Sequence, residues 1–378
     1  MPVTRIRVLG FRNLAPQELE LADGITLLWG PNGAGKTNAL EALCVAVAGR
    51  SFRTRREREA IAFGEPLARV EAQVRHDAEV HELLWSLSAD GARRHLVDGN
   101  EVTGEHAEQR PALAVFLPDR LGLIKGPPGA RRAHLDRLCA ALWPARAESR
   151  GRYGRALAQR NALLSRVRAG SASHESLEAW EWELASAGVE LAAARRKAVA
   201  ALAPEFATAG EELGLPGEPE LLYVPRSDAT KEDELAAQLR AGREADLARG
   251  YTTRGPHLDE LTLSLGGRSL RRYGSQGEQR TALLALLFAE RRALLEARRS
   301  PPLMVLDDVM SELDPARRGL LARRLAEGGG QAVLTATEPS QLPDDCERTE
   351  LALRQGEATS ASPPAAPVSA APAPALAA

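Results

Sequence analysis

One segment of this chain has the residue types and spacing of a loop that binds nucleoside triphosphates. GPNGAGKT, residues 30–37, fits the pattern GxxxxGK[ST] and lies between a predicted strand and a predicted helix. Glycines let backbone N–H groups wrap around phosphates, and the start of the helix adds a favourable dipole. We expect Lys36 to reach the β- and γ-phosphates and Thr37 to offer its hydroxyl to Mg²⁺. An ordinary glycine-rich turn is disfavoured, because the strand before this segment and the helix after it are those expected around a phosphate-binding loop. The predicted ATP-binding residues of this segment are Gly30, Pro31, Asn32, Gly33, Ala34, Gly35, Lys36 and Thr37.

A pair of carboxylates follows an apolar segment near the other end of the chain. LMVLDD, residues 303–308, reads as a buried strand that ends in Asp307 and Asp308. Open α/β sheets bind ligands at the carboxyl ends of their strands. We expect Asp307 to hold Mg²⁺ through water and Asp308 to accept a proton from the attacking water, so the predicted catalytic residues are Asp308 and Lys36. A polar turn that caps the next helix is the alternative, and the presence of residues 30–37 disfavours it.

A third segment, SQGEQR at residues 275–280, opens a long predicted helix. Ser275 and Glu278 have the spacing of a capping box, so a good helix start explains this segment without any ligand. A helix N-terminus with a Ser hydroxyl and a glycine is also suited to a γ-phosphate. Because it shares the chain with the other two segments, we predict that Ser275, Gln276 and Gly277 bind ATP as well.

The elements around these segments predict an α/β fold. Residues 3–11 and 24–29 read as strands, and residues 38–49 as a helix that ends at a glycine. Alternating apolar residues over 69–103, with a hairpin signal at Asp98–Gly99, predict an antiparallel β appendage. Strand and helix patterns then alternate over residues 275–337, which indicates a parallel sheet.

Between these parts the composition changes to Ala, Leu, Arg and Glu. Residues 131–249 predict an all-helical insertion of several helices, broken near residues 214–225. A sustained heptad pattern is missing, so ordinary amphipathic helices are favoured over a coiled coil. Beyond Gln355 the chain is Ala, Pro and Ser with one charge, a composition that cannot bury enough surface to order itself.

Composition limits the partners of the protein. The 378 residues carry 49 Lys plus Arg and 51 Asp plus Glu, a net charge of −2, so any nucleic-acid binding must use local basic patches. No apolar run approaches the ~20 residues that a bilayer needs and no leader segment is evident, so we expect a cytoplasmic protein with no membrane partner. The three cysteines are far apart, which indicates neither disulfides nor zinc.

Two arginine runs are the candidate DNA contacts. Arg53, Arg55 and Arg56 belong to the densest run, and Arg131 with Arg132 form a second. Each run fits a solvated face as well. No aromatic residues lie between the arginines, so contact with a duplex backbone is favoured over stacking on single strands.

The ordered set of motifs resembles the SMC-like branch of ABC ATPases. This set is GPNGAGKT, SQGEQR, LDDVMSELD at residues 306–314 and a closing TAT at 335–337. Further strings resemble the RecF family, and the match covers about residues 1–355. These strings are FRNL at 11–14, GRSFRT at 49–54, VFLPDRLGLIKGPPGARRAHLD at 115–136 and RGPHLDEL at 254–261.

The resemblance implies an ABC-type, SMC-like P-loop ATPase head with a parallel sheet, an antiparallel β subdomain and an inserted all-helical arm. The implied division is an N-terminal head part over 1–135, the arm over 136–248, a C-terminal head part over 249–354 and a disordered tail over 355–378. It also implies ATP-driven homodimerisation, in which Ser275 and Gly277 of one chain touch nucleotide bound at Lys36 of the other.

The implied function is recombinational repair and replication. Members of this family bind double-stranded and gapped DNA, act with RecR, and help to load RecA on DNA coated by single-strand binding protein. The chain departs from the ABC pattern at three places: Glu278 replaces a Gln or Gly, Asp308 replaces a Glu, and Thr335 or Thr337 stands in place of the switch His. We therefore expect a slow, weak ATPase.

The position of the Q-loop stays open at this point, and other classes of protein are weighed against an ATP-switched DNA-binding dimer. Gln73 and the stretch around Pro118 are both candidates for the Q-loop. A transporter subunit is disfavoured by the long insertion, and a nuclease by the absence of a spare acidic cluster. A non-hydrolysing scaffold, or an SMC-like ATPase with another role in DNA maintenance, is the remaining alternative.

Overall fold

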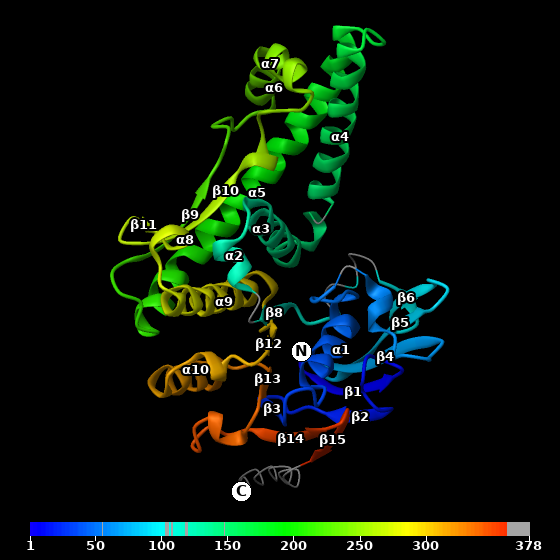
Figure 1. The fold of residues 1–378 in the computed structure, drawn as a ribbon, viewed down its shortest axis with the longest axis vertical. Coiled ribbons are helices and arrows are strands. Elements are labelled where there is room, and N and C mark those ends of the chain that lie inside the picture. Colours follow the sequence, from blue (N-terminus) through cyan, green and yellow to red (C-terminus); the bar gives the residue numbers. More distant parts are fainter. Residues whose placement is uncertain (55, 103–105, 107–108, 118–119, 147, 361–378) are drawn as a thin grey trace, which may run out of the picture.

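The computed structural model describes residues 1–360 apart from 55, 103–105, 107–108, 118–119 and 147. Two six-stranded sheets lie at one end of the molecule, and a helical arm extends away from them (Figure 1). The expected disorder over residues 361–378 lies outside the described residues.

The first sheet is antiparallel, in the order β2-β1-β4-β5-β6-β7. Side chains that face the core alternate with exposed ones along its strands, as at Val70, Ala72 and Val74 in β4. Trp85 is fully buried in the same core. The predicted appendage is therefore confirmed, but it is not separate, because β1 pairs with β4 in the register Val8↔Val70. Its strands are β1 (Val3–Leu9), β2 (Gln17–Glu20), β4 (Leu67–His76), β5 (Glu79–Ser88), β6 (Arg93–Val97) and β7 (Asn100–Glu101).

The second sheet has the order β15-β14-β3-β13-β12-β8, and all neighbouring pairs are parallel except β14–β15. Its strands are almost continuously apolar, as expected of a sheet covered on both faces. They are β3 (Ile25–Trp29), β8 (Leu113–Phe116), β12 (Leu303–Leu306), β13 (Ala332–Ala336), β14 (Thr349–Arg354) and β15 (Glu357–Ser360). The prediction that the chain is disordered from residue 355 is wrong for residues 357–360, because β15 pairs with β14.

Different helices cover the two faces of the parallel sheet. Helix α1 (Lys36–Ala48) packs with Leu28 and Val333 in one core, which the antiparallel sheet also lines. Helices α9 (Gln276–Arg298) and α10 (Pro315–Glu327) pack with Leu27 and Leu334 in the other. Adjacent residues of one strand thus point to opposite cores, which holds the sheet rigidly and fixes the ends of its strands.

The arm is formed by α3 (Pro128–Leu142), α4 (Ser149–Arg168), α5 (Leu177–Glu212), α6 (Glu232–Ala241) and α7 (Arg243–Arg249). Helix α5 runs from the arm onto α9 of the head (Figure 1). The insertion is not all-helical, which corrects the prediction. The predicted break near residues 214–225 contains the strand β9 (Pro219–Val224). This strand pairs with β10 (Glu260–Leu265), which pairs on its other side with β11 (Arg268–Ser269). The short helices α2 (Leu121–Lys125) and α8 (Leu270–Tyr273) complete the fold.

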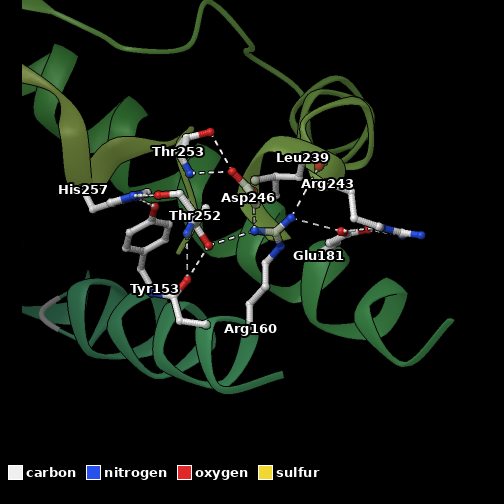
Figure 2. Close-up of polar contacts among 10 residues, drawn as sticks. Tyr153, Arg160, Glu181, Leu239, Arg243, Asp246, Thr252, Thr253 and His257 are labelled. Atoms are coloured by element: carbon white, nitrogen blue, oxygen red, sulfur yellow. Dashed lines mark hydrogen bonds and ion pairs between the residues drawn. The ribbon is translucent and has the colours of Figure 1, made fainter. Parts of the chain in front are cut away.

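A buried ionic network ties the arm together. Figure 2 shows the Arg160 guanidinium between Glu181 and Asp246, at 3.1 and 2.7 Å, with all three side chains at most 1% exposed. Arg243 pairs with the same Glu181, and Thr252 accepts a further bond from Arg160. The network therefore joins α4, α5, α7 and the segment that leads back to the head. No helix in the described part of the chain is both long and apolar enough to cross a membrane.

Candidate nucleotide-binding site

The loop over residues 30–35 joins β3 to α1, as predicted, and its backbone depends on glycine. Gly30 has φ 156°, and a Cβ there would lie 2.2 Å from the Leu353 carbonyl oxygen. Gly35 has φ 105°, and a Cβ there would meet the Leu14 side chain at 3.0 Å. Larger residues at these two positions would move the loop away from β14 and the FRNL segment. The loop leads directly into the first turn of α1, where Lys36 and Thr37 lie.

The Lys36 side chain folds back over this loop. Its Nζ donates to the carbonyl oxygens of Gly30, at 2.7 Å, and Pro31, at 3.1 Å. Burial lowers the pKa of the ammonium group, and the nearby Asp308 and Asp307 carboxylates oppose that shift. A positive charge held inside a curled loop is suited to phosphate oxygens, which would replace these carbonyl contacts.

Asp307 lies at the carboxyl end of β12 and meets two threonine hydroxyls. Thr37 Oγ1 lies 3.0 Å from both carboxylate oxygens, and Thr335 Oγ1 donates to Oδ1 at 2.7 Å. Burial raises the pKa of Asp307, and the two hydroxyl bonds oppose that rise. The predicted metal ligands Thr37 and Asp307 are therefore together.

Asp308 has an unusual backbone and side chain. Its φ is 46°, in the left-handed region, and its N–H donates to Thr335 Oγ1 at 2.8 Å. Its Oδ1 is buried and has no hydrogen-bond partner among the described residues. Buried carboxylate oxygens are normally bonded, so this atom fits a group that gains its partner when ligand arrives.

These residues fit Mg²⁺ bound together with a nucleotide. A hydroxyl and a carboxylate oxygen are the ligands that Mg²⁺ prefers, with phosphate oxygens and waters completing the octahedron. No group of three or more His, Cys, Asp or Glu that could hold a metal occurs in the described ranges of the chain. Thr37 and Asp307 would therefore hold the ion together with phosphate oxygens and waters.

The signature segment is both capped and exposed, so the two interpretations of its sequence are compatible. Glu278 N donates to Ser275 Oγ at 3.2 Å, and Ser275 N donates to the Glu278 carboxylate at 2.7 Å, which completes the capping box. Ser275, Gln276 and Gly277 are all exposed. Over the described residues, no hydrogen bond joins them to residues 30–37 of the same chain. Their surface is free to meet another molecule.

Arg53, predicted to contact DNA, is exposed and lies beside the nucleotide loop. Its Nη1 donates to Asn38 Oδ1 at 2.6 Å, and it lies 3.6 Å from the buried Glu41 carboxylate. Asn38 in turn donates to Asn13, whose amide donates to the Gly33 carbonyl at 3.1 Å. Sequence reasoning missed Asn13 as a support of the loop, because its only signal was the FRNL string.

In the second arginine run, Arg131 is buried and Arg132 is half-buried. Arg131 is 3% exposed, and it donates to Glu260 and to three backbone carbonyl oxygens near the start of α3. Arg132 donates to the Asp259 carbonyl at 2.9 Å. The prediction that Arg131 contacts DNA is therefore wrong, because burial leaves it no surface. Arg56 is exposed, and Arg55 lies outside the described residues.

A different set of arginines comes together from the end of α1, the start of α2, the inside of α3 and the start of α4. We call Arg50, Arg120, Arg137 and Arg150 the junction arginines. Burial and neighbouring positive charges lower the pKa of Arg50 and Arg137, and the neighbours that act on Arg137 are the other three members. Arg150 is paired with Asp136 at 3.3 Å, and Arg120 with Glu290 at 3.8 Å. Among the described residues, these four arginines outnumber the two carboxylates paired with them, and their scattered positions in the sequence did not reveal this.

Gln73 is not in a loop, so that candidate for the Q-loop is wrong. It lies in the middle of β4 and pairs with Arg5 on one side and Glu82 on the other. The other candidate, Pro118, lies outside the described residues.

Comparisons with known proteins agree with this architecture. The family model described as RecF/RecN/SMC N terminal domain matches residues 2–355. A DNA replication and repair protein RecF from Anaeromyxobacter dehalogenans is 38% identical over 362 residues, covering 91% of this chain and 96% of the relative. The protein of the same name from Heliobacterium modesticaldum is 36% identical and covers 90% and 95%.

Solved structures of RecF and of an SMC head share this fold. The recombination mediator protein RecF with ATPrS superposes with a TM-score of 0.85 at 28% identity, covering 96% of this chain and 98% of that one. The structure with ATP also scores 0.85, at 28% identity over 95% and 97%. An SMC head bound to the C-winged helix domain of ScpA shares the fold, with a TM-score of 0.57 at 15% identity over 95% and 98%.

Proposed function

The chain belongs to the RecF family of SMC-like ABC ATPases, and from that premise we propose that it is an ATP-switched, DNA-binding dimer that acts in DNA replication and recombinational repair. The observation that carries the proposal is the meeting of Lys36, Thr37, Asp307 and Asp308 at the carboxyl ends of β3 and β12. The names of the relatives, DNA replication and repair proteins and a recombination mediator, support the biological role.

Each site residue has a distinct part in ATP binding and hydrolysis. Lys36 neutralises the β- and γ-phosphates, and the loop N–H groups cradle them. Thr37 and Asp307 hold Mg²⁺, which when bound screens the charge that develops between these phosphates. Asp308 orients the attacking water and accepts its proton through the oxygen that is otherwise unpartnered. An Asp reaches less far than a Glu, which supports a slow reaction.

The exposed signature segment completes the site across a dimer. Ser275 and Gly277 lie at the N-terminus of the 23-residue helix α9, where backbone N–H groups and the helix dipole favour an anion. Because no hydrogen bond among the described residues joins them to residues 30–37 of their own chain, we assign them to the γ-phosphate of nucleotide bound by a second copy. ATP then acts as the ligand that joins two heads.

DNA contact is assigned to the junction arginines and to Arg56 rather than to the predicted run at Arg131. The set joins the head, through Arg50 after α1, to the arm, through Arg137 in α3 and Arg150 in α4. Dimerisation would bring two such patches together and bind duplex or gapped DNA through its backbone. By analogy with the family, the DNA-bound dimer acts with RecR and helps to load RecA on DNA coated by single-strand binding protein.

A non-hydrolysing scaffold is the second candidate. The absence of a switch His and the short Asp308 side chain favour it, and measured turnover separates the two. The deciding experiment is to determine the oligomeric state with and without Mg²⁺–ATP, and with and without duplex DNA, while phosphate release is followed. ATP-dependent dimers that release phosphate slowly are expected. A monomer under all four conditions would refute the proposed switch.

A further inference from the structure

Thr335 lies between the two carboxylates that follow β12, although it belongs to the neighbouring strand β13. Its side chain is completely buried. The hydroxyl donates to Asp307 Oδ1 at 2.7 Å and accepts from Asp308 N at 2.8 Å. Both of its directional bonds thus end on the residues proposed to hold metal and to activate water.

The two bonds have different consequences. The bond to Asp307 Oδ1 fixes the orientation of the carboxylate, both oxygens of which lie 3.0 Å from Thr37 Oγ1. The bond from Asp308 N fastens a left-handed residue, with φ 46°, that a non-glycine side chain adopts only at a cost. That backbone conformation determines where the unpartnered Asp308 Oδ1 is directed. When Thr37 turns to ligate the ion, Thr335 is the side-chain donor to Asp307 that remains among the described residues.

We propose that Thr335 is a positioning residue of the ATPase site, which orients Asp307 for the metal and Asp308 for the water through one hydroxyl. The inference rests on the proposed nucleotide function. It also explains how this chain arranges its carboxylates without a switch His. Thr337, the other candidate for that place, bonds instead through its backbone N–H to the Gln341 side chain at 3.1 Å.

Thr335→Val tests the hydroxyl with little change in shape, since both residues are β-branched and suit a buried strand. Thr26→Val is the matched control. Thr26 is equally buried in β3 of the same sheet, and its hydroxyl accepts one bond from Ala22 N at 3.0 Å. Thr335→Ser restores the hydroxyl. Thr335→Ala replaces the valine variant if the latter fails to fold.

For Thr335→Val we expect kcat to fall about tenfold or more and half-saturating Mg²⁺ to rise about tenfold, as when other supports of metal ligands are lost. The KM for ATP should change by less than about threefold, because the loop and Lys36 are intact. Thr335→Ser should recover most of the activity, and Thr26→Val should match wild type despite a similar loss of thermal stability.

Three results would overturn the inference. They are unchanged kcat and Mg²⁺ dependence in Thr335→Val, equal losses in Thr26→Val, and a serine variant as poor as the valine one. Failure of the proposed function would look different, because the wild-type protein itself would then show no Mg²⁺-dependent turnover of ATP.

Discussion

The Thr37 hydroxyl lies 3.0 Å from both carboxylate oxygens of Asp307, although 270 positions separate the two residues in the chain. The contact forms because β3 and β12 both pair in parallel with β13, so their carboxyl ends meet at one edge of the sheet. The two predicted metal ligands are thus placed by the core of the head. Substitutions at the site should therefore change ligand chemistry while the fold persists.

Lys36→Met should abolish ATP-dependent dimerisation. Methionine is similar in length but lacks the charge that neutralises the phosphates, so nucleotide affinity should fall at least about tenfold. Nucleotide binding by calorimetry and dimer formation by light scattering measure the two effects. Lys125→Met, at an exposed lysine at the end of α2, is the control and should match wild type. Unchanged ATP affinity in Lys36→Met would contradict the assignment of the loop.

Asp308→Asn should separate binding from hydrolysis. Asparagine preserves the size of the side chain and cannot accept the proton, so turnover should fall about 10²-fold or more. ATP should still assemble the dimer, which should then persist because its nucleotide is not cleaved. Single-turnover phosphate release and the lifetime of the dimer are the measurements. Wild-type turnover in this variant would remove Asp308 from the mechanism.

Ser275→Arg should bind nucleotide as a monomer and fail to dimerise. The large cation blocks the approach of the signature, but it also removes the cap of α9, at a cost of about 1 kcal/mol. Ser275→Asp separates these effects, because Asp caps well and yet repels a γ-phosphate. Both variants should fail to dimerise in gel filtration with ATP. Normal dimers from either would count against contact across the dimer.

Much of the head could be predicted because its signals are local. The pattern at residues 30–37 depends on glycines and a lysine within eight positions. It also favours a metal site over a polar turn for the apolar strand that ends in Asp307 and Asp308. The position of Thr335 could not be deduced in the same way. Its contacts depend on the order of strands in the sheet, which places β13 between β3 and β12.

The sequence predictions that were wrong share a physical cause. In each case the residue or strand has partners that are distant in the chain. Arg131 looks like part of a basic surface beside Arg132, but Glu260, 129 positions away, neutralises it inside the protein. The strand β9 reads as a break between helices because its partner β10 begins only after α6 and α7. The four junction arginines come from four separate parts of the chain, so no local charge run reveals them.

Arg160→Met should destabilise the arm strongly. Removing the guanidinium leaves Glu181 and Asp246 with less compensation inside the protein, and breaking a buried pair typically costs about 3–5 kcal/mol. Arg152→Met is the control, because its pair with Glu183 is about 40% exposed and such pairs contribute about 0–1 kcal/mol. Urea unfolding measures both changes. Equal stability of the two variants would show that the network adds nothing.

Replacing Arg50, Arg137 and Arg150 by Ala should weaken DNA binding and reduce its dependence on salt. If each arginine contacts one phosphate, the slope of log affinity against log salt should flatten by about 2 to 3. Arg120 is left in place, because it supports the buried Glu290. Affinity should fall equally on different duplex sequences, since backbone contacts do not read bases.

The control for this triple variant replaces Arg7, Arg69 and Arg75, three exposed arginines on the antiparallel sheet that are paired with Glu71 or Asp23. It removes the same charge from another face, so a general loss of positive charge would flatten both slopes alike. ATP should strengthen binding by the wild-type protein and by the control, because dimerisation joins two half-sites into one. An unchanged slope in the junction variant would identify these arginines as a solvated face, and an affinity that does not respond to ATP would separate DNA binding from the switch.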